Sequence, residues 1–218
     1  MESVKTFIFQ NESFGEELKV YINELVDPEY GMFTWPSAPV LGQFILKHEH
    51  ECHGKNVLEL GAGTALPGIV AAKCGANVIL SDSSKFPKCQ ENALKSCISN
   101  NVESRIIQVP LTWGEFTPEL LDLPKLDVIL GSDCFYNPND FEDIIVTIAF
   151  LMEKNPNCVF WCTYQVRSSN WTIENILKKW KLKCTHINLS SFGGDQENLG
   201  GHEISQKHAI QMLEIKMF

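Results

Sequence analysis

Long apolar runs are missing from this sequence of 218 residues. None reaches the roughly 18 residues that a membrane span requires. The first stretch, MESVKTFIFQNESFGEELKV, has no basic flank followed by a long apolar run, so we expect no signal peptide. Internal repeats and low-complexity segments are missing as well, so nothing in the sequence indicates a repeat architecture.

Cysteine pairs with metal-binding spacing are also missing, although the chain has eight cysteines. None forms C-x-x-C, and no histidine–cysteine cluster has zinc spacing. Cys74 and Cys134 fall in apolar stretches, where a free cysteine behaves as a small hydrophobic residue. We therefore expect a reduced intracellular protein without a structural metal.

Positive charge is scarce, because 18 lysines and arginines stand against 27 acidic residues and give a net charge of −9. Such a surface repels nucleic acid and anionic membranes and attracts basic proteins. The alternative is that the charge serves solubility alone. We expect a basic protein partner, no direct contact with nucleic acid and no membrane binding.

The remaining composition, 44% hydrophobic and 21% charged, is typical of a globular chain with a sizeable core. From residue 56 onward strand-like and helix-like stretches alternate. This order predicts a doubly wound α/β fold with a mostly parallel sheet and a ligand at one sheet edge. The expected strands are 56–60, 76–81, 105–109, 126–131 and 158–163, followed by 185–189 and 210–217, and the expected helices are 67–74, 86–99, 140–154 and 170–180.

Two regions depart from this alternation. Residues 1–35 are expected to form an extension of short strands and turns, and 36–218 the main domain. A helix should begin near Pro36, with Val40, Leu41, Phe44 and Ile45 on one apolar face. The strands 185–189 and 210–217 have no long helix between them, so we expect them to pair antiparallel at the sheet edge. The segment 190–203, rich in glycine and acids, is expected to be a mobile linker.

A glycine-rich turn follows the first strand of the main domain, in NVLELGAGTALPG at 56–68. Gly61 and Gly63 fit the dinucleotide fingerprint G-x-G-x-x-G, but Leu66 replaces its third glycine. Glu59 extends the motif to E-x-G-x-G. A carboxylate there suits a cationic ligand such as S-adenosylmethionine, which carries an ammonium and a sulfonium. The glycines would allow the backbone to approach that ligand closely.

Two further carboxylates end neighbouring strands. Asp82 lies 21 residues after Gly61, where it can accept hydrogen bonds from ribose hydroxyls or merely cap the next helix. Asp133 and Tyr136 follow the fourth strand in LDVILGSDCFY. A carboxylate and an aromatic face together can hold an amine or guanidinium, the ring contributing about 0.5–2 kcal/mol. The alternatives are a turn role for Asp133 and core packing for Phe135 and Tyr136.

The motifs WPSA, LELGAGTALPGIVAA, VILSD, LTWG and LGSDCFY together resemble the seven-β-strand S-adenosylmethionine-dependent methyltransferases. More narrowly, they resemble family 16, whose members mostly methylate lysine on non-histone proteins and chaperones. The resemblance runs from about residue 31 to 167. The stretches SDSSKFPKCQENAL, DFEDIIVTIAFLMEKNP and TYQVRSSNW resemble one branch of that family, which is associated with arginine methylation on histone H3.

This resemblance implies a Rossmann-like class I fold of seven strands with the last strand antiparallel. It places the D-x-x-Y motif on Asp133 to Tyr136, with Asp133 orienting the acceptor and Tyr136 forming an aromatic wall. A Y-x-x-R feature near the substrate falls on Tyr164 and Arg167, although Arg167 could equally pair with a surface carboxylate. The expected cofactor contacts, together with Glu59, are Trp35, Gly61, Ala62, Gly63, Asp82, Trp113 and Ser132, and Trp35 could instead be a hydrophobic staple.

One feature of dedicated arginine methyltransferases, a loop whose two glutamates grip the guanidinium, is missing from this sequence. The acidic candidates near the fourth strand are Asp133, Asp140, Glu142 and Asp143, of which the last three could simply form the first turn of the next helix. The choice of arginine as acceptor therefore depends on the resemblance.

The leading interpretation is a chromatin-regulating protein N-methyltransferase that uses S-adenosylmethionine and acts on arginine of histone H3. The alternatives are a lysine methyltransferase acting on chaperones and a non-catalytic scaffold that regulates chaperones or transcription factors. Small-molecule or nucleic-acid acceptors and a dinucleotide oxidoreductase are less favoured. We expect a monomer that resides in the nucleus and cytoplasm and binds a histone tail or chaperone.

Overall fold

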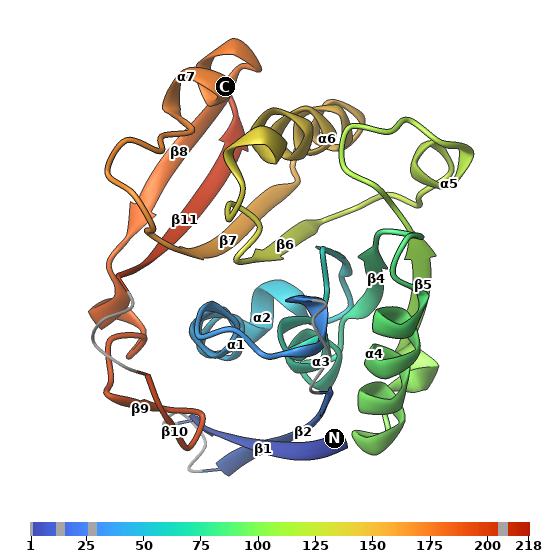
Figure 1. Ribbon diagram of the computed structural model, residues 1–218, viewed down its shortest axis with the longest axis vertical. Helices are drawn as coiled ribbons and strands as arrows, with labels where there is room; N and C mark the ends of the chain where they lie inside the picture. The colour runs from blue at the N-terminus through green and yellow to red at the C-terminus, as the bar shows by residue number, and fades with distance from the viewer. Residues whose placement is uncertain (1, 12–15, 26–29, 205–208) are drawn as a thin grey trace.

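The computed structural model describes residues 2–11, 16–25, 30–204 and 209–218. A seven-stranded sheet crosses the molecule in the order β5-β4-β3-β6-β7-β11-β8, and in Figure 1 it curves around α1 and α3. Neighbouring strands from β5 to β7 are parallel, whereas β11 runs antiparallel to both β7 and β8. The strands are β3 (Asn56–Leu60), β4 (Asn77–Asp82), β5 (Ile106–Pro110), β6 (Val128–Ser132), β7 (Val159–Gln165), β8 (Leu182–Ile187) and β11 (Ile210–Met217).

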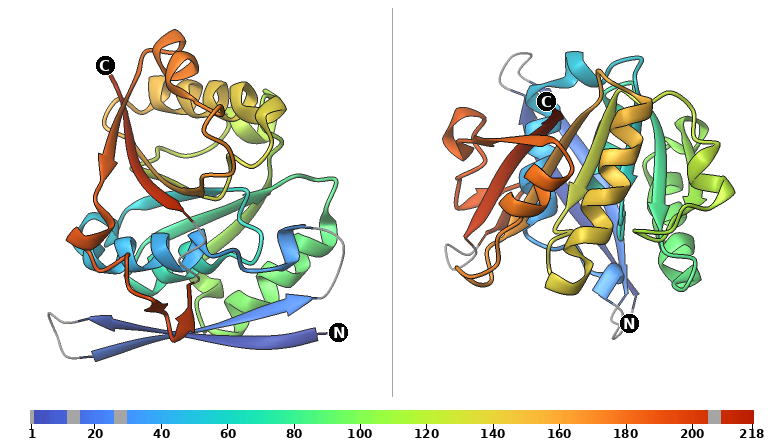
Figure 2. Two further views of the ribbon diagram at one scale, coloured as in Figure 1. Left: turned by 60° about the vertical axis from the view of Figure 1, so that its left-hand side comes forward. Right: turned by 90° about the horizontal axis from the view of Figure 1, so that it is seen from above.

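The expected doubly wound fold with one antiparallel strand is confirmed, because helices cover both faces of this sheet (Figure 2). Alternate strand residues point to opposite faces, so Val57 and Leu58 enter two different hydrophobic clusters. One face carries α1 (Ser37–Lys47), α2 (Glu49–Cys52), α3 (Leu66–Lys73) and α4 (Pro87–Ser99), and the other α5 (Pro118–Leu121), α6 (Phe141–Lys154) and α7 (Glu174–Lys179).

The N-terminal residues form a hairpin of β1 (Glu2–Asn11) and β2 (Glu16–Leu25), which lies outside α1 and α3 as a further layer (Figure 1). Phe7 and Phe9 of β1, and Val20 and Ile22 of β2, are fully buried in the cluster that also contains α1 and α3. The hairpin therefore shares the core of the larger sheet. The boundary between residues 35 and 36 remains a prediction from the sequence.

The outer edge of β2 is paired with side chains of α4 rather than with another strand. Asn100 accepts a hydrogen bond from the Tyr21 N–H at 3.0 Å and donates one to the Tyr21 carbonyl at 2.6 Å. Ser96 Oγ accepts from the Asn23 N–H at 3.0 Å, and Asn92 donates to the Asn23 carbonyl at 2.7 Å. Asn92 and Ser96 of α4 and Asn100, which caps its C-terminal end, recur every four positions, so they share one face and satisfy the outer edge of β2.

Two sequence expectations need correction. The segment 190–203 is folded onto the hairpin: Leu199 is buried, and the Gly200 carbonyl accepts a 2.9 Å hydrogen bond from Ile8. It contains the short strands β9 (Asn198–Leu199) and β10 (His202–Glu203). The late strand expected at 185–189 is β8, which begins three residues earlier. Single 3-10 turns occur at Tyr30–Met32, Glu103–Arg105, Pro138–Asp140 and Leu189–Ser191.

Among the described residues, no helix is long and apolar enough to cross a membrane. The same part of the chain has no cluster of three histidine, cysteine or acidic side chains suited to a metal ion.

Candidate active site

The candidate site lies where β3, β4 and β6 end, because parallel strands bring their carboxyl ends to one sheet edge. Gly61 follows β3, Asp82 ends β4, and Asp133 follows β6. Trp113 and Tyr136 join this edge from the loops after β5 and β6. The residues expected from three separate motifs therefore meet in one region.

The glycine turn is close-packed on both sides. Gly61 and Gly63 have φ of +62° and +53°, a left-handed conformation that favours glycine. A Cβ added at Gly61 would lie 2.8 Å from the Trp113 ring, and one at Gly63 would lie 3.2 Å from the Gly31 carbonyl. Ala65 also has a positive φ, of 65°. Gly61 and Gly63 therefore have no room for a side chain.

Asp82 is tied to that turn. Its Oδ2 accepts the Gly63 N–H at 3.0 Å, and its Oδ1 accepts the Ser83 N–H at 2.8 Å. Burial raises the pKa of this carboxyl, while the two N–H bonds act in the opposite direction. The capping alternative is wrong, because α4 begins at Pro87 with Phe86 as its N-cap. The ribose role remains a prediction.

Cys89 is a neighbour of this site that the sequence did not reveal. Its Sγ lies 3.3 Å from the Gly31 carbonyl oxygen, 3.5 Å from that of Gly63 and 3.6 Å from Asp82 Oδ2. The thiol thus joins the glycine turn to the segment before α1. No spacing rule relates these positions, because the contact forms only when α4 folds back on the sheet.

Glu59 does not face the open edge. It is only 1% exposed, and its Oε2 accepts the Gly68 N–H at 2.9 Å. Burial raises the pKa of this carboxyl to about 8, against the lowering effect of the Gly68 bond. A Cβ at Gly68 would lie 2.5 Å from Glu59 Oε2, so β3 and α3 approach closely here. The expected direct contact between Glu59 and a ligand ammonium does not fit this geometry, and Glu59 instead holds α3 against β3.

Asp133 has a partner within the chain. Arg167, which follows β7, donates to Oδ1 at 2.9 Å and to Oδ2 at 2.7 Å, a bidentate pair. The Gln165 N–H also donates to Oδ1, at 3.2 Å. The Asp133 side chain is 5% exposed and that of Arg167 25%. Hydrogen bonding to Asp133 raises the pKa of Arg167. The expected alternative for Arg167 was a surface carboxylate, but its partner is the buried carboxylate of the D-x-x-Y motif.

The aromatic residues of this motif have different environments. Phe135 is buried and packs edge-on against Phe141 and Tyr164. Tyr136 is 42% exposed, and its ring lies 6.4 Å from that of Trp113. The core-packing alternative therefore holds for Phe135 and is wrong for Tyr136, whose ring is accessible to an acceptor.

Other expected residues lie around the same edge. Trp35 is partly exposed. Its ring meets that of the exposed Phe33 edge-on, with 5.5 Å between the ring centroids, and this aromatic pair was not predicted from the sequence. Ala62 and Ser132 are partly exposed beside the glycine turn and at the end of β6. Their roles toward a cofactor remain predictions.

The other acidic candidates are engaged elsewhere. Glu142 pairs with Lys179 of α7, and Asp140 accepts a 2.9 Å bond from Asn137. The Asp143 carboxylate is close to Gly114, next to Trp113. Asp133 is therefore the candidate that lies directly at the strand edge.

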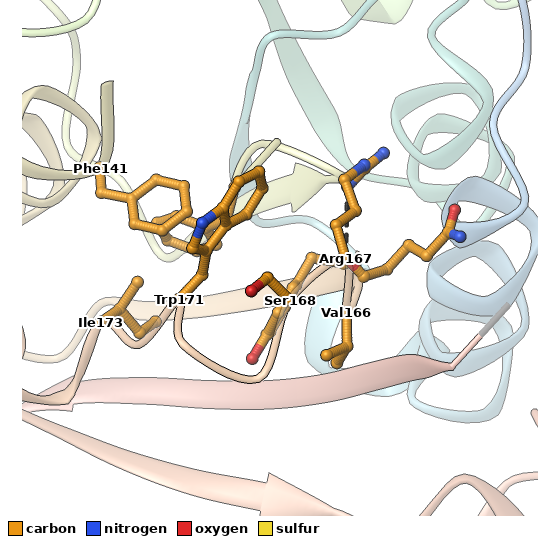
Figure 3. Close-up of a pocket in the computed structure, with 9 residues that line it drawn as sticks. Phe141, Val166, Arg167, Ser168, Trp171 and Ile173 are labelled. Atoms are coloured by element: carbon orange, nitrogen blue, oxygen red, sulfur yellow. Dashed lines mark hydrogen bonds between the residues drawn. The ribbon is translucent and has the colours of Figure 1, made fainter. Parts of the chain in front are cut away.

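Two cavities border the described residues. One, of about 10 Å³, lies beside Arg167 between Phe141, Trp171 and Ile173 and is too small for a ligand (Figure 3). The other, of about 680 Å³, lies between the hairpin and α1 and is bordered by Gln10 and Lys47. Neither of these two is lined by the glycine turn, and the expected residues instead converge at the strand edge.

The fold and this site together define a class I methyltransferase that uses S-adenosylmethionine. A putative RNA methyltransferase from Pyrococcus horikoshii superposes with a TM-score of 0.60 at 12% identity, covering 89% of this chain and 90% of that one. Magnesium protoporphyrin IX methyltransferase from Synechocystis, solved with bound S-adenosylmethionine, gives 0.58 at 14% identity and covers 84% and 80%. These structures support the fold.

The chain belongs to the lysine methyltransferase family, whose model matches residues 15–179. It is 49% identical to histone-arginine methyltransferase METTL23 of Xenopus laevis over 99% of this chain and 92% of that protein. The METTL23 of Homo sapiens is 50% identical over 84% of this chain and 96% of its own. Protein N-lysine methyltransferase METTL21A of Mus musculus is 30% identical over 63% of each chain. The expected family, enzyme class and cofactor are confirmed.

Proposed function

We propose that this chain is a protein N-methyltransferase whose acceptor is an arginine side chain of a histone, with H3 as the first candidate. Relatives named as histone-arginine methyltransferases support this acceptor, because their similarity covers nearly the whole chain. One structural observation carries the proposal. An open aromatic ring, Tyr136, meets the glycine turn through Trp113, and the buried carboxylate of Asp133 directly follows β6, the strand next to the one that ends at this turn.

The glycine turn fits S-adenosylmethionine, because glycines at positive φ present backbone groups without side chains at the carboxyl end of β3. When bound, this cofactor supplies an electrophilic methyl group for an in-line displacement. Glu59 would act on it only indirectly, by fixing β3 and α3. The residues proposed to hold the cofactor are Trp35, Gly61, Ala62, Gly63, Asp82, Trp113 and Ser132.

Asp133 and Tyr136 would orient the acceptor. Arginine keeps its proton in the ground state, because its pKa lies far above neutral pH, so its nitrogen needs a carboxylate that orients and polarises it. Asp133 supplies that carboxylate at the strand edge, and the Tyr136 ring would lie against the cationic plane. Catalysis would then consist mainly of positioning the nitrogen opposite the methyl group.

Lysine is the second candidate acceptor. The family model is described as lysine methyltransferase, and METTL21A is named as an N-lysine enzyme. A lysine ammonium needs to donate only one hydrogen bond to Asp133, and the carboxylate can accept it. We propose a basic protein, such as a histone tail or a chaperone, as the partner of this monomer, because the chain carries a net charge of −9. Residence in the nucleus and cytoplasm is part of the same proposal.

The test is incubation of the purified protein with S-adenosylmethionine and a panel of histones and a heat-shock chaperone, followed by intact-mass analysis and fragmentation. We expect one or more methyl groups on an H3 arginine. The control is Gly61→Ala, in which a Cβ 2.8 Å from Trp113 should block the cofactor turn. Methylation confined to lysine would replace the arginine proposal, and cofactor binding without any transfer would favour the scaffold alternative.

Asp133→Ala gives a second, sharper prediction. Transfer should be abolished, because the acceptor loses its orienting carboxylate, whereas cofactor affinity should survive. Calorimetric titration with S-adenosylmethionine and the mass assay measure the two effects separately. Wild-type activity in Asp133→Ala would show that Asp133 does not orient the acceptor.

A further inference from the structure

Asp133 has little hydrogen-bonding capacity left. A carboxylate offers about four lone-pair sites. Oδ1 accepts from the Gln165 N–H at 3.2 Å and from Arg167 Nη1 at 2.9 Å, and Oδ2 accepts from Arg167 Nη2 at 2.7 Å. One site, on Oδ2, is left for an acceptor. A bidentate grip on an incoming guanidinium is therefore impossible while Arg167 is bound.

Arg167 is fixed by the end of β7. Its Nη1 also donates to the Gln165 carbonyl at 3.2 Å, so backbone and carboxylate hold the guanidinium together. Figure 3 shows Val166 and Arg167 leaving the chain in opposite directions, as successive residues of an extended segment do. Phe141 and Trp171 pack edge-on beside this segment. The adjoining cavity of about 10 Å³ is too small to take the guanidinium.

Asp133 is itself held in an unusual conformation. Its φ is +55°, a left-handed conformation that residues other than glycine adopt rarely. Its N–H donates to the Thr163 carbonyl at 2.7 Å, and its carboxylate meets Gln165 and Arg167. Three contacts with β7 and the segment after it thus fix both the backbone and the side chain of one residue at the site.

We propose that Arg167 is a positioning residue that presents Asp133 to the acceptor with one free lone-pair site. The acceptor nitrogen then forms a single N–H···Oδ2 bond rather than a bidentate pair, and its second terminal nitrogen is left to face the cofactor. This inference depends on the proposed function, because it assigns Asp133 to acceptor binding. It differs from a blocking role, in which Arg167 would have to leave before the acceptor could bind.

The experiment is chemical rescue of Arg167→Ala. We expect kcat on the H3 peptide to fall roughly a hundredfold while the Kd for S-adenosylmethionine is unchanged, since a misplaced carboxylate costs orientation and not cofactor binding. Millimolar ethylguanidinium should restore part of kcat by refilling the arginine site. Urea, which has a similar shape without the charge, should not. Arg105→Ala, which removes an exposed arginine contacting the Gly75 carbonyl, is the matched control and should show neither loss nor rescue.

The outcomes separate this inference from the proposed function. No transfer by the wild-type protein would overturn the proposed function, and the role of Arg167 with it. Wild-type transfer with an equally or more active Arg167→Ala, or inhibition by ethylguanidinium, would overturn the positioning role alone. If Arg167→Ala fails to fold, Arg167→Lys retains the charge without the bidentate geometry and should still lose kcat. Full activity in Arg167→Lys would contradict the proposal.

Discussion

At the scale of single residues, the buried carboxyl groups of Asp133 and Glu59 differ in how the protein stabilises them: within the described part of the chain, one has a cationic partner and the other does not. Asp133 is neutralised by the guanidinium of Arg167, with which it forms two hydrogen bonds. Among the residues that the structure describes, Glu59 has no cation beside it, and it accepts one N–H, from Gly68. Burial therefore raises the pKa of Glu59 to about 8, so the carboxyl is mostly protonated at neutral pH.

Glu59 predicts how stability depends on pH. The folded chain holds this proton up to about pH 8, whereas the unfolded carboxyl loses it near its ordinary value of 4.5. Between these values the folded state binds more protons, so the Glu59 contribution to the free energy of unfolding decreases as pH rises. Glu59→Gln keeps an oxygen for the Gly68 N–H and removes the titration. Its stability relative to wild type should increase from pH 5 to pH 8 by up to about 4 kcal/mol.

Urea denaturation of both proteins across this pH range measures the effect. Glu91→Gln, on the exposed face of α4, is the matched control and should follow the wild-type profile. If Glu59→Gln and wild type give parallel profiles, Glu59 does not hold its proton as described.

The sequence identified most site residues but not their contacts. Asp82, Asp133 and Tyr136 were found because strand ends and residue types are local signals. The pairing of Asp133 with Arg167 joins positions 34 apart and depends on β6 and β7 being neighbours in the sheet. Because side chains alternate between the two faces of β3, the pattern predicts that Glu59 points to the same face as Val57. Whether that side chain is buried depends on α3, the helix that packs on this face.

At the scale of elements, the order of strands and helices and the antiparallel pairing of the last two strands could be predicted, whereas the burial of α1 and the place of β11 in the sheet could not. The pattern after Pro36 predicts one apolar face, yet Ser37 to Leu46 of α1 are all buried. The cause is the hairpin, which covers the side that would otherwise face solvent. The place of β11 between β7 and β8 could not be predicted from the local sequence pattern either, because strand order depends on pairing between residues that are far apart in the chain.

The α4 face that satisfies β2 provides an element-scale prediction. Asn100→Ala should lower the free energy of unfolding by about 1–3 kcal/mol, because the Tyr21 N–H and carbonyl lose their partner at a buried position. Thermal denaturation measures this change. Glu91→Ala, on the exposed face of the same helix, should stay within about 0.5 kcal/mol of wild type. Equal effects of the two substitutions would mean that solvent satisfies the β2 edge in the variant.

At the scale of the whole molecule, the hairpin and the main sheet share one hydrophobic core. Removal of residues 1–35 deletes the buried side chains of Phe7, Phe9, Val20 and Ile22. At about 1.5–3 kcal/mol each, their burial contributes roughly 6–12 kcal/mol. That is comparable to the entire stability of a domain, about 5–15 kcal/mol. We therefore expect the chain starting at residue 36 to be unfolded or aggregated.

Circular dichroism and size-exclusion chromatography of the shortened chain test this expectation. Val4→Ala, which alters an exposed hairpin residue, should leave both measurements unchanged. A shortened chain that melts cooperatively at the wild-type temperature would mean that the extension is a separable unit.

The position of β11 also determines when the sheet can be completed during synthesis. The strand lies between β7 and β8, yet the ribosome makes it after both of them. Until residues 210–217 emerge from the exit tunnel, β8 has no neighbour in the sheet and one edge of β7 is unpaired. A chain that lacks β11 therefore presents an unpaired edge of β7, along Phe160 and Trp161, on which another strand could add. The interval before β11 emerges is when a chaperone would engage this protein.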